Sequence, residues 1–153
     1  QAQAGFSPVE SYAWHRPLLA RTATQYDPRV RARIERGANM LAADYVELVR
    51  ARTDGIARME QALAGFDAVL SPTVPITAPT IASVAPGAER DDEFFRVNGL
   101  LLRNPSVINM LDGCALSLPC HTPGELPVGM MVWHGALHDD TVLNVALQLE
   151  QFL

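Results

Sequence analysis

Apolar residues recur in the first half of the chain at intervals typical of helices. Between positions 30 and 63 most of them lie three, four or seven residues apart, which is the repeat of one helical face. Gly37 interrupts the pattern and Gly65 follows its end, where a glycine commonly caps a helix. The sequence therefore predicts two consecutive helices, over 29–37 and 40–64.

The residues before these helices carry start and stop signals. Asp27 can accept hydrogen bonds from the first free amides of a helix, and Pro28 suits the first helical position. Scattered apolar side chains over 8–24 indicate a further short helix. We expect that helix to stop near Pro17, because an internal proline removes one backbone hydrogen bond and crowds the preceding turn.

Three short apolar runs in the second half predict strands, over 68–71, 115–118 and 128–133. The last two flank Pro123 and Gly124, a dipeptide suited to a type II turn. We expect these two runs to form an antiparallel hairpin with a long tip.

A proline-rich segment follows the first predicted strand. Prolines punctuate the chain from Pro72 to Gly87, so we expect a long surface loop without regular structure. Loops of this length are often functional. A helix is then predicted over 92–103, and Asn109 is expected in a further short helical or turn segment.

The end of the chain predicts one more helix, capped by Asp139 or Asp140. Its apolar face is expected to comprise Val142, Val145, Ala146, Leu149 and Phe152. The whole order of elements favours an α/β fold with helices packed on a mixed β-sheet. Three short strands would leave an exposed edge, so we expect the sheet to continue into strands from another part of the polypeptide.

Composition narrows the class of protein. The chain of 153 residues with 48% hydrophobic content suits one hydrophobic core, and we expect a single domain portion over 1–153. The net charge of -5 disfavours nucleic acid as a partner, because phosphate contacts need clustered cations. No apolar run approaches the length of a membrane helix, so we expect no membrane partner.

The two cysteines, Cys114 and Cys120, are separated by five residues and match no zinc or redox spacing. Free thiols indicate a reducing, cytoplasmic location. The chain begins at Gln1 without the features of a signal peptide, and we expect the gene product to begin upstream.

Three segments, in this order and at these intervals, carry a resemblance to a known family. Residues 67–79 read DAVLSPTVPITAP, residues 103–119 read RNPSVINMLDGCALSLP, and residues 126–132 read LPVGMMV. They resemble corresponding segments of amidase-signature enzymes, and the resemblance runs from about residue 10 to the end. It implies the C-terminal part of the amidase-signature fold, and it extends to members of the fatty acid amide hydrolase type and to the A subunits of amidotransferases.

Three positions depart from the family pattern. Pro105 stands where threonine is usual, Asp112 where glycine is frequent, and Cys114 where proline is usual. An aspartate at position 112 is similar to the variant in fatty acid amide hydrolases. These departures affect the expected substrate rather than the expected fold.

The resemblance also implies a chemistry that this chain does not carry. Amidase-signature enzymes hydrolyse amides with a Ser-Ser-Lys arrangement beside a glycine-rich oxyanion hole, without a cofactor. A serine hydroxyl needs a base to take its proton and donors to hold the developing oxyanion. All twelve basic residues are arginine, and no two serines are adjacent. We therefore expect a chain that is inactive alone, with no catalytic residue and no metal ligand of its own.

The implied role of this chain is a wall of the substrate pocket. The candidates lie in the proline-rich loop and the asparagine block: Thr73, Asn104, Ser106, Ile108, Asn109 and Asp112. For Asn109, a side chain that holds turn backbone is an equal alternative. The expected partners are a small-molecule amide, the N-terminal part of the same enzyme, and a second copy that would cover exposed apolar surface.

Three alternatives remain weaker. A Ser-His-Asp hydrolase lacks a G-x-S-x-G elbow, and Ser117 on a predicted strand favours a buried, hydrogen-bonded hydroxyl. His134 and His138 have the spacing of a helical metal pair, but Gly135 makes the interval a loop. The chain is otherwise a free-standing binding or oligomerisation module that presents helix 40–64 to its partner.

Overall fold

The computed structural model describes residues 5–153, which divide into two compact units with a boundary after Thr53. The first unit contains helix α1 (Phe6–Thr22), the 3-10 turn η1 (Ala23–Gln25), helix α2 (Pro28–Glu35) and the 3-10 turn η2 (Arg36–Asn39). Helix α3 (Ala42–Leu63) begins in the first unit and ends in the second. The expectation of one domain portion over the whole chain stays a prediction.

The first unit corrects one expectation and confirms another. Helix α1 continues through Pro17 instead of stopping there. Both Pro17 and Ala13, whose carbonyl loses its helical partner, are exposed, so water can bond that carbonyl. Asp27 caps α2 as predicted, since its side chain accepts hydrogen bonds from the amides of Arg29 and Val30.

Gly37 marks the predicted break between helices and also allows close packing. It lies in η2 and is buried against α1. A Cβ at this position would meet the carbonyl oxygen of Pro8 and would lie 2.7 Å from the Cα of Val9. The predicted cap at Gly65 is also present, with φ of 90° two residues after the end of α3.

The second unit is built on a three-stranded sheet. Its strands are β1 (Val69–Pro72), β2 (Cys114–Pro119) and β3 (Gly129–His134), in the order β1-β3-β2. All three predicted strands are confirmed, as is the α/β class. Both pairings among the described residues are antiparallel, so these three strands do not themselves form the mixed sheet that we expected.

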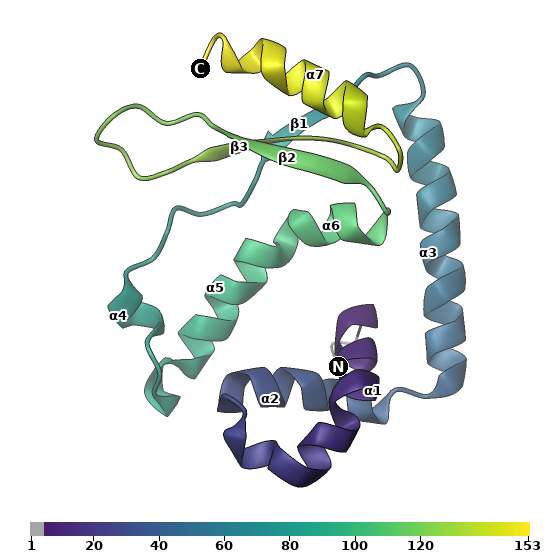
Figure 1. The fold of residues 1–153 in the computed structure, drawn as a ribbon, viewed down its shortest axis with the longest axis vertical. Coiled ribbons are helices and arrows are strands. Elements are labelled where there is room, and N and C mark those ends of the chain that lie inside the picture. The colour runs from purple at the N-terminus through teal and green to yellow at the C-terminus, as the bar shows by residue number, and fades with distance from the viewer. Residues whose placement is uncertain (1–4) are drawn as a thin grey trace. The chain divides into compact units, whose positions relative to one another are not determined.

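Helices lie on both faces of this sheet. Figure 1 shows α7 (Asp139–Glu150) on one face, and α5 (Asp91–Arg103) with α6 (Pro105–Met110) on the other. The core beneath α7 comprises Leu118, Val132, Val142 and Ala146, and Val132 is completely buried. This packing confirms the apolar face predicted for the last helix, except at Phe152.

The last helix differs from expectation at both ends. His138 occupies its N-cap position without a side-chain hydrogen bond, while Asp139 and Asp140 lie in the first turn. There they complement the helix dipole, although neither is the cap. Phe152 lies beyond the helix and is 85% exposed.

The hairpin between β2 and β3 has the predicted long tip and turn. Cys114 pairs with His134 at one end, and the amide of Cys120 donates to the carbonyl of Val128 beyond the other. Glu125 N-H donates to the carbonyl of Thr122, and Gly124 between them has φ of 93°, as a type II turn requires.

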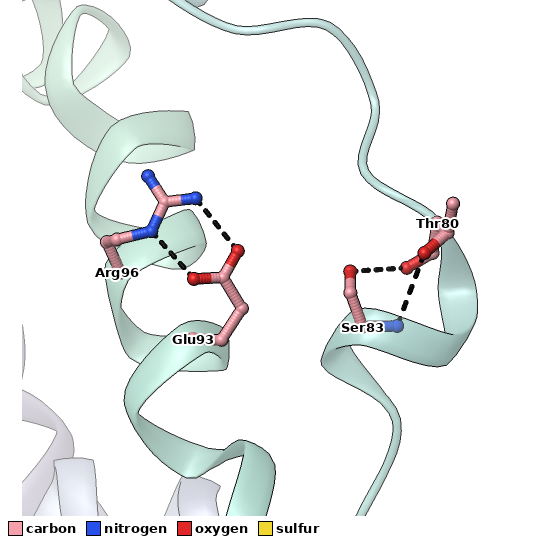
Figure 2. Close-up of polar contacts among 4 residues, drawn as sticks. All are labelled: Thr80, Ser83, Glu93 and Arg96. Atoms are coloured by element: carbon pink, nitrogen blue, oxygen red, sulfur yellow. Dashed lines mark hydrogen bonds and ion pairs between the residues drawn. The ribbon is translucent and has the colours of Figure 1, made fainter.

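The proline-rich segment after β1 contains more regular structure than expected. It holds the short helix α4 (Ile81–Val84), followed by the 3-10 turn η3 (Ala88–Arg90). Thr80 caps α4 and also accepts from the Ser83 hydroxyl through its carbonyl, as Figure 2 shows. A threonine cap therefore allows one helical turn between the prolines.

Helix α5 carries an ion pair on its exposed surface. Arg96 donates two hydrogen bonds to the carboxylate of Glu93, at 2.7 and 2.8 Å (Figure 2). These bonds lower the pKa of Glu93.

Among the helices of residues 5–153, none is long and apolar enough to cross a membrane.

Candidate functional site

The end of β1 and the junction between α5 and α6 meet in the second unit. The side-chain amide of Asn104 donates to the carbonyl oxygen of Pro72 at 2.7 Å, across 32 positions of sequence. The backbone carbonyl of Asn104 also accepts from the amide of Val107, so this residue begins α6. Asn104 thereby holds the start of the proline-rich loop beside the asparagine block.

Thr73 is fixed to the sheet by two hydrogen bonds. Its amide donates to the carbonyl of Gly129 at 2.8 Å, and its hydroxyl lies 2.6 Å from the hydroxyl of Ser117. A Cβ on Gly129 would meet the Ser117 oxygen and would lie 2.8 Å from the Thr73 oxygen. The absence of a side chain at Gly129 is therefore what lets the two hydroxyls approach each other.

Helix α6 and the turn after it carry four of the candidates. Ser106 and Asn109 are exposed on α6, whereas Ile108 is buried. The carbonyl of Ile108 accepts from Gly113 N-H at 3.0 Å. Ile108 therefore supports the turn from the buried side of α6, while Ser106 and Asn109 are exposed to solvent.

Asp112 adopts the left-handed backbone region, with φ of 53°. Its amide donates to the carbonyl of Asn109 at 3.4 Å, which closes the turn into β2. Aspartate tolerates this conformation better than most side chains do. The exposed carboxylate of Asp112 is thus presented by a tight turn directly after α6.

Sequence reasoning missed the part that Ser117 plays. We expected a buried, hydrogen-bonded hydroxyl; the hydroxyl is hydrogen-bonded, but the residue is exposed. Ser71 and Ser117 both pair with Met131, from opposite sides, so their side chains share one face of the sheet. The alternation of side chains along each strand could have indicated which face Ser117 is on. Placing Ser117 beside Ser71 also required the pairing register between the strands, which the sequence does not state.

These polar groups can form hydrogen bonds with a ligand, but they cannot activate a nucleophile. Thr73 and Ser117 form their side-chain hydrogen bond with each other, and neither is bonded to an imidazole or a carboxylate within residues 5–153. The hydroxyl of Ser71 is buried and has no hydrogen-bond partner in the same part of the chain. The arrangement offers neutral donors and acceptors without a general base.

The histidine pair considered for zinc has a structural role. His134 is buried, and its Nδ1 accepts from Gly135 N-H at 2.8 Å, so Nε2 carries the proton and donates to the carbonyl of Phe66 at 3.2 Å. The ring centroids of His134 and His138 lie 3.8 Å apart, with the ring planes tilted by 39° to each other. A cavity of about 290 Å³ beside the pair is also lined by Glu60. Within the described residues no three His, Cys, Asp or Glu side chains gather to hold a metal ion.

Comparison with known sequences shows the family. The Amidase family matches residues 9–143 of this chain. The A subunit of glutamyl-tRNA(Gln) amidotransferase from Synechococcus sp. (strain CC9311) is 31% identical over 141 residues, covering 88% of this chain and 28% of that protein. Its counterpart from Streptomyces coelicolor is 30% identical over 132 residues, covering 82% of this chain and 25% of that protein.

Solved structures agree in fold. A crystal structure of an amidase superposes with a TM-score of 0.78 at 25% identity, covering 98% of this chain and 34% of that one. A variant of Kluyveromyces lactis allophanate hydrolase gives a TM-score of 0.76 at 25% identity, covering 91% of this chain and 22% of that one. The chain thus spans between about a fifth and a third of the length of these relatives. Sequence and fold together show that this chain belongs to the amidase family.

Proposed function

We propose that this chain is the C-terminal portion of an amide C-N hydrolase of the amidase-signature type, and that it is inactive alone. It supplies strands of the sheet and one wall of the substrate pocket. The observation that carries the proposal is the family match over residues 9–143 in a chain that contains no lysine and no adjacent serines.

The chemistry of amide cleavage explains why the pocket wall and the catalytic groups are proposed to lie in different parts of the enzyme. A hydroxyl nucleophile needs a base, and the tetrahedral intermediate needs oriented N-H donors. In the described residues the side-chain hydroxyls of Thr73 and Ser117 have only each other as hydrogen-bond partners. In this proposal the Ser-Ser-Lys groups and the oxyanion hole therefore come from a part of the enzyme outside residues 1–153.

The pocket wall is proposed to consist of the polar groups around the end of β1 and α6. Thr73 and Asn104 are fixed by hydrogen bonds to Gly129 and Pro72, so they are positioned before a substrate arrives. Ser106, Asn109 and Asp112 add exposed polar groups from α6 and the turn that follows it, while the buried Ile108 supports them.

The sheet is proposed to continue beyond β1. Among the described strands β1 pairs only with β3, so one edge of its backbone is open. Leu70 on this strand is 50% exposed and lines a groove of about 360 Å³ with Val145 and Leu149 of α7. An open edge beside an apolar groove suits another strand of the same enzyme, since both features favour pairing.

The substrate is proposed to be a carboxamide of small size. Some relatives are named amidotransferase subunits and others an amidase or an allophanate hydrolase. Transfer of an amide nitrogen and hydrolysis both break an amide C-N bond. The wall proposed here serves either reaction, because it binds the acyl side of the substrate and moves no proton.

A serine-directed probe tests where the nucleophile lies. The complete enzyme is treated with a fluorophosphonate, digested and mapped by mass spectrometry. We expect the modified serine in a peptide outside residues 1–153, and we expect no labelling of Ser71, Ser106 or Ser117. Active-site labelling of any serine within 1–153, with loss of amide hydrolysis, would overturn the proposal.

A further inference from the structure

The hydroxyls of Thr73 and Ser117 form one hydrogen bond with each other, so one of their two O-H protons has no acceptor in this pair. Each hydroxyl carries one O-H donor, and the bond of 2.6 Å uses only one of the two. Neither side chain makes another hydrogen bond within residues 5–153. The pair therefore presents one unused O-H donor.

Backbone hydrogen bonds of the sheet fix this donor in place. Thr73 is held by its amide bond to the carbonyl of Gly129, and Ser117 lies in the paired part of β2, opposite Met131. Ser117 is exposed and Thr73 half-buried, so a ligand can reach the pair from solvent. A donor positioned before binding loses little conformational entropy when a ligand arrives.

The surroundings favour an uncharged acceptor. The groups that hydrogen-bond around the pair are the carbonyl of Gly129 and, at the neighbouring Pro72, the side-chain amide of Asn104. All of them are neutral. No cationic side chain is hydrogen-bonded to the pair within residues 5–153, so a carboxylate or phosphate would lose hydration there without gaining an opposite charge. An ether, hydroxyl or carbonyl oxygen loses less hydration and matches a neutral O-H donor.

We infer that the Thr73 and Ser117 hydroxyls form a specificity-determining donor site for a neutral oxygen in the acyl portion of the amide substrate. The inference rests on the proposed function, because it assigns a role to the proposed pocket wall. It names a substrate class: carboxamides with an uncharged oxygen in the acyl chain.

The expected size of the effect follows from the type of bond. A hydrogen bond between neutral groups contributes about 0.5–1.5 kcal/mol, which corresponds to roughly 2- to 13-fold in kcat/KM. The effect is a ratio between two substrates. Changes that lower the activity on both substrates equally do not alter this ratio.

The test compares matched substrates with the complete enzyme. In each pair one methylene of the acyl chain is replaced by an ether oxygen, as in butyramide and methoxyacetamide, with the oxygen moved along a series of longer chains. A single substitution leaves one hydroxyl with a free proton but without the partner that orients it, so the decisive variant carries both Thr73→Val and Ser117→Ala. Thr77→Val, at an exposed position of the same loop, is the control.

We expect the wild-type enzyme and Thr77→Val to favour the ether at one chain position, and the double variant to lose that preference by about 2- to 13-fold. If the double variant does not fold, each single variant is expected to weaken the preference, since the remaining hydroxyl has lost its partner. Unchanged ratios for all pairs in the folded variants would overturn the inference alone. A wild-type enzyme that hydrolyses no carboxamide would overturn the proposed function as well.

Discussion

The hydroxyl of Thr73 lies 2.6 Å from that of Ser117, although the two residues are 44 positions apart in the sequence. The contact joins the start of the proline-rich loop to the second strand of the sheet. It exists because Gly129, on the strand between them, has no side chain. Thr73 lies in the segment 67–79 and Ser117 in the segment 103–119, so the contact joins two of the segments that resemble the family.

Gly129→Ala is expected to destabilise the second unit by about 1–3 kcal/mol, because the new Cβ overlaps two positioned hydroxyls. Urea unfolding followed by circular dichroism measures the change. Gly99→Ala is the control: a Cβ there meets nothing within 4 Å, and alanine is favoured in a helix by about 1 kcal/mol. Equal stability of the two variants would contradict the close approach at Gly129.

His134→Phe is expected to cost about 2–4 kcal/mol, since it leaves the amide of Gly135 and the carbonyl of Phe66 without their ring partners. The ring size is kept, so the loss reports the hydrogen bonds. His138→Phe keeps an aromatic ring beside His134 at an exposed position and is expected to change stability much less. A larger loss for His138→Phe would contradict the structural role assigned to His134.

Glu125 is expected to titrate below the usual pH range of a glutamate. The backbone amide of Thr122 lowers its pKa most, followed by the Thr122 side chain and then by the charge of His121. Because the folded pKa is depressed, the stabilisation is present above the unfolded pKa and is lost as pH falls through the folded pKa. Carbon-13 NMR titration of the carboxyl group measures it.

Thr122→Ala is the companion variant for that titration. It keeps the backbone donor, so most of the depression of the Glu125 pKa is expected to remain. A pKa that returns fully to the ordinary value in Thr122→Ala would mean that the side chain, not the backbone amide, is the main cause.

The isolated chain is expected to self-associate through the open edge of β1 and its apolar groove. Leu70→Lys places a charge on that edge and is expected to give a monomer in light scattering. Leu137→Lys, at a residue that is 94% exposed on a loop, is the control and should still associate. A wild-type chain that stays monomeric at all salt concentrations would contradict this expectation.

Local pattern was enough for much of the fold. The three-four spacing of apolar residues predicted α3, and the short apolar runs predicted all three strands. Asp27 caps α2 through its side chain, and Gly65 ends α3 because a residue without a Cβ adopts a positive φ readily. These features depend on neighbours within one turn or one strand, so the sequence specifies them directly.

The misses have two physical sources. Pro17 stays inside α1 because its position is exposed, and Asp139 is not the cap because a one-residue shift places His138 there. Local rules cannot fix such choices. The contacts of Thr73 with Ser117 and of Asn104 with Pro72 depend on strand register and helix packing, which no local pattern contains.

The central claim is that this chain holds a pocket wall without catalytic groups. The most direct measurement is ammonia release from aliphatic and aromatic carboxamides by purified chain 1–153 and by the complete enzyme, side by side. We predict release by the complete enzyme and none above the uncatalysed rate by the chain, because base, nucleophile and oxyanion donors each contribute about 10²-fold or more. Release by the isolated chain that persists in preparations free of contaminating hydrolases would contradict the claim.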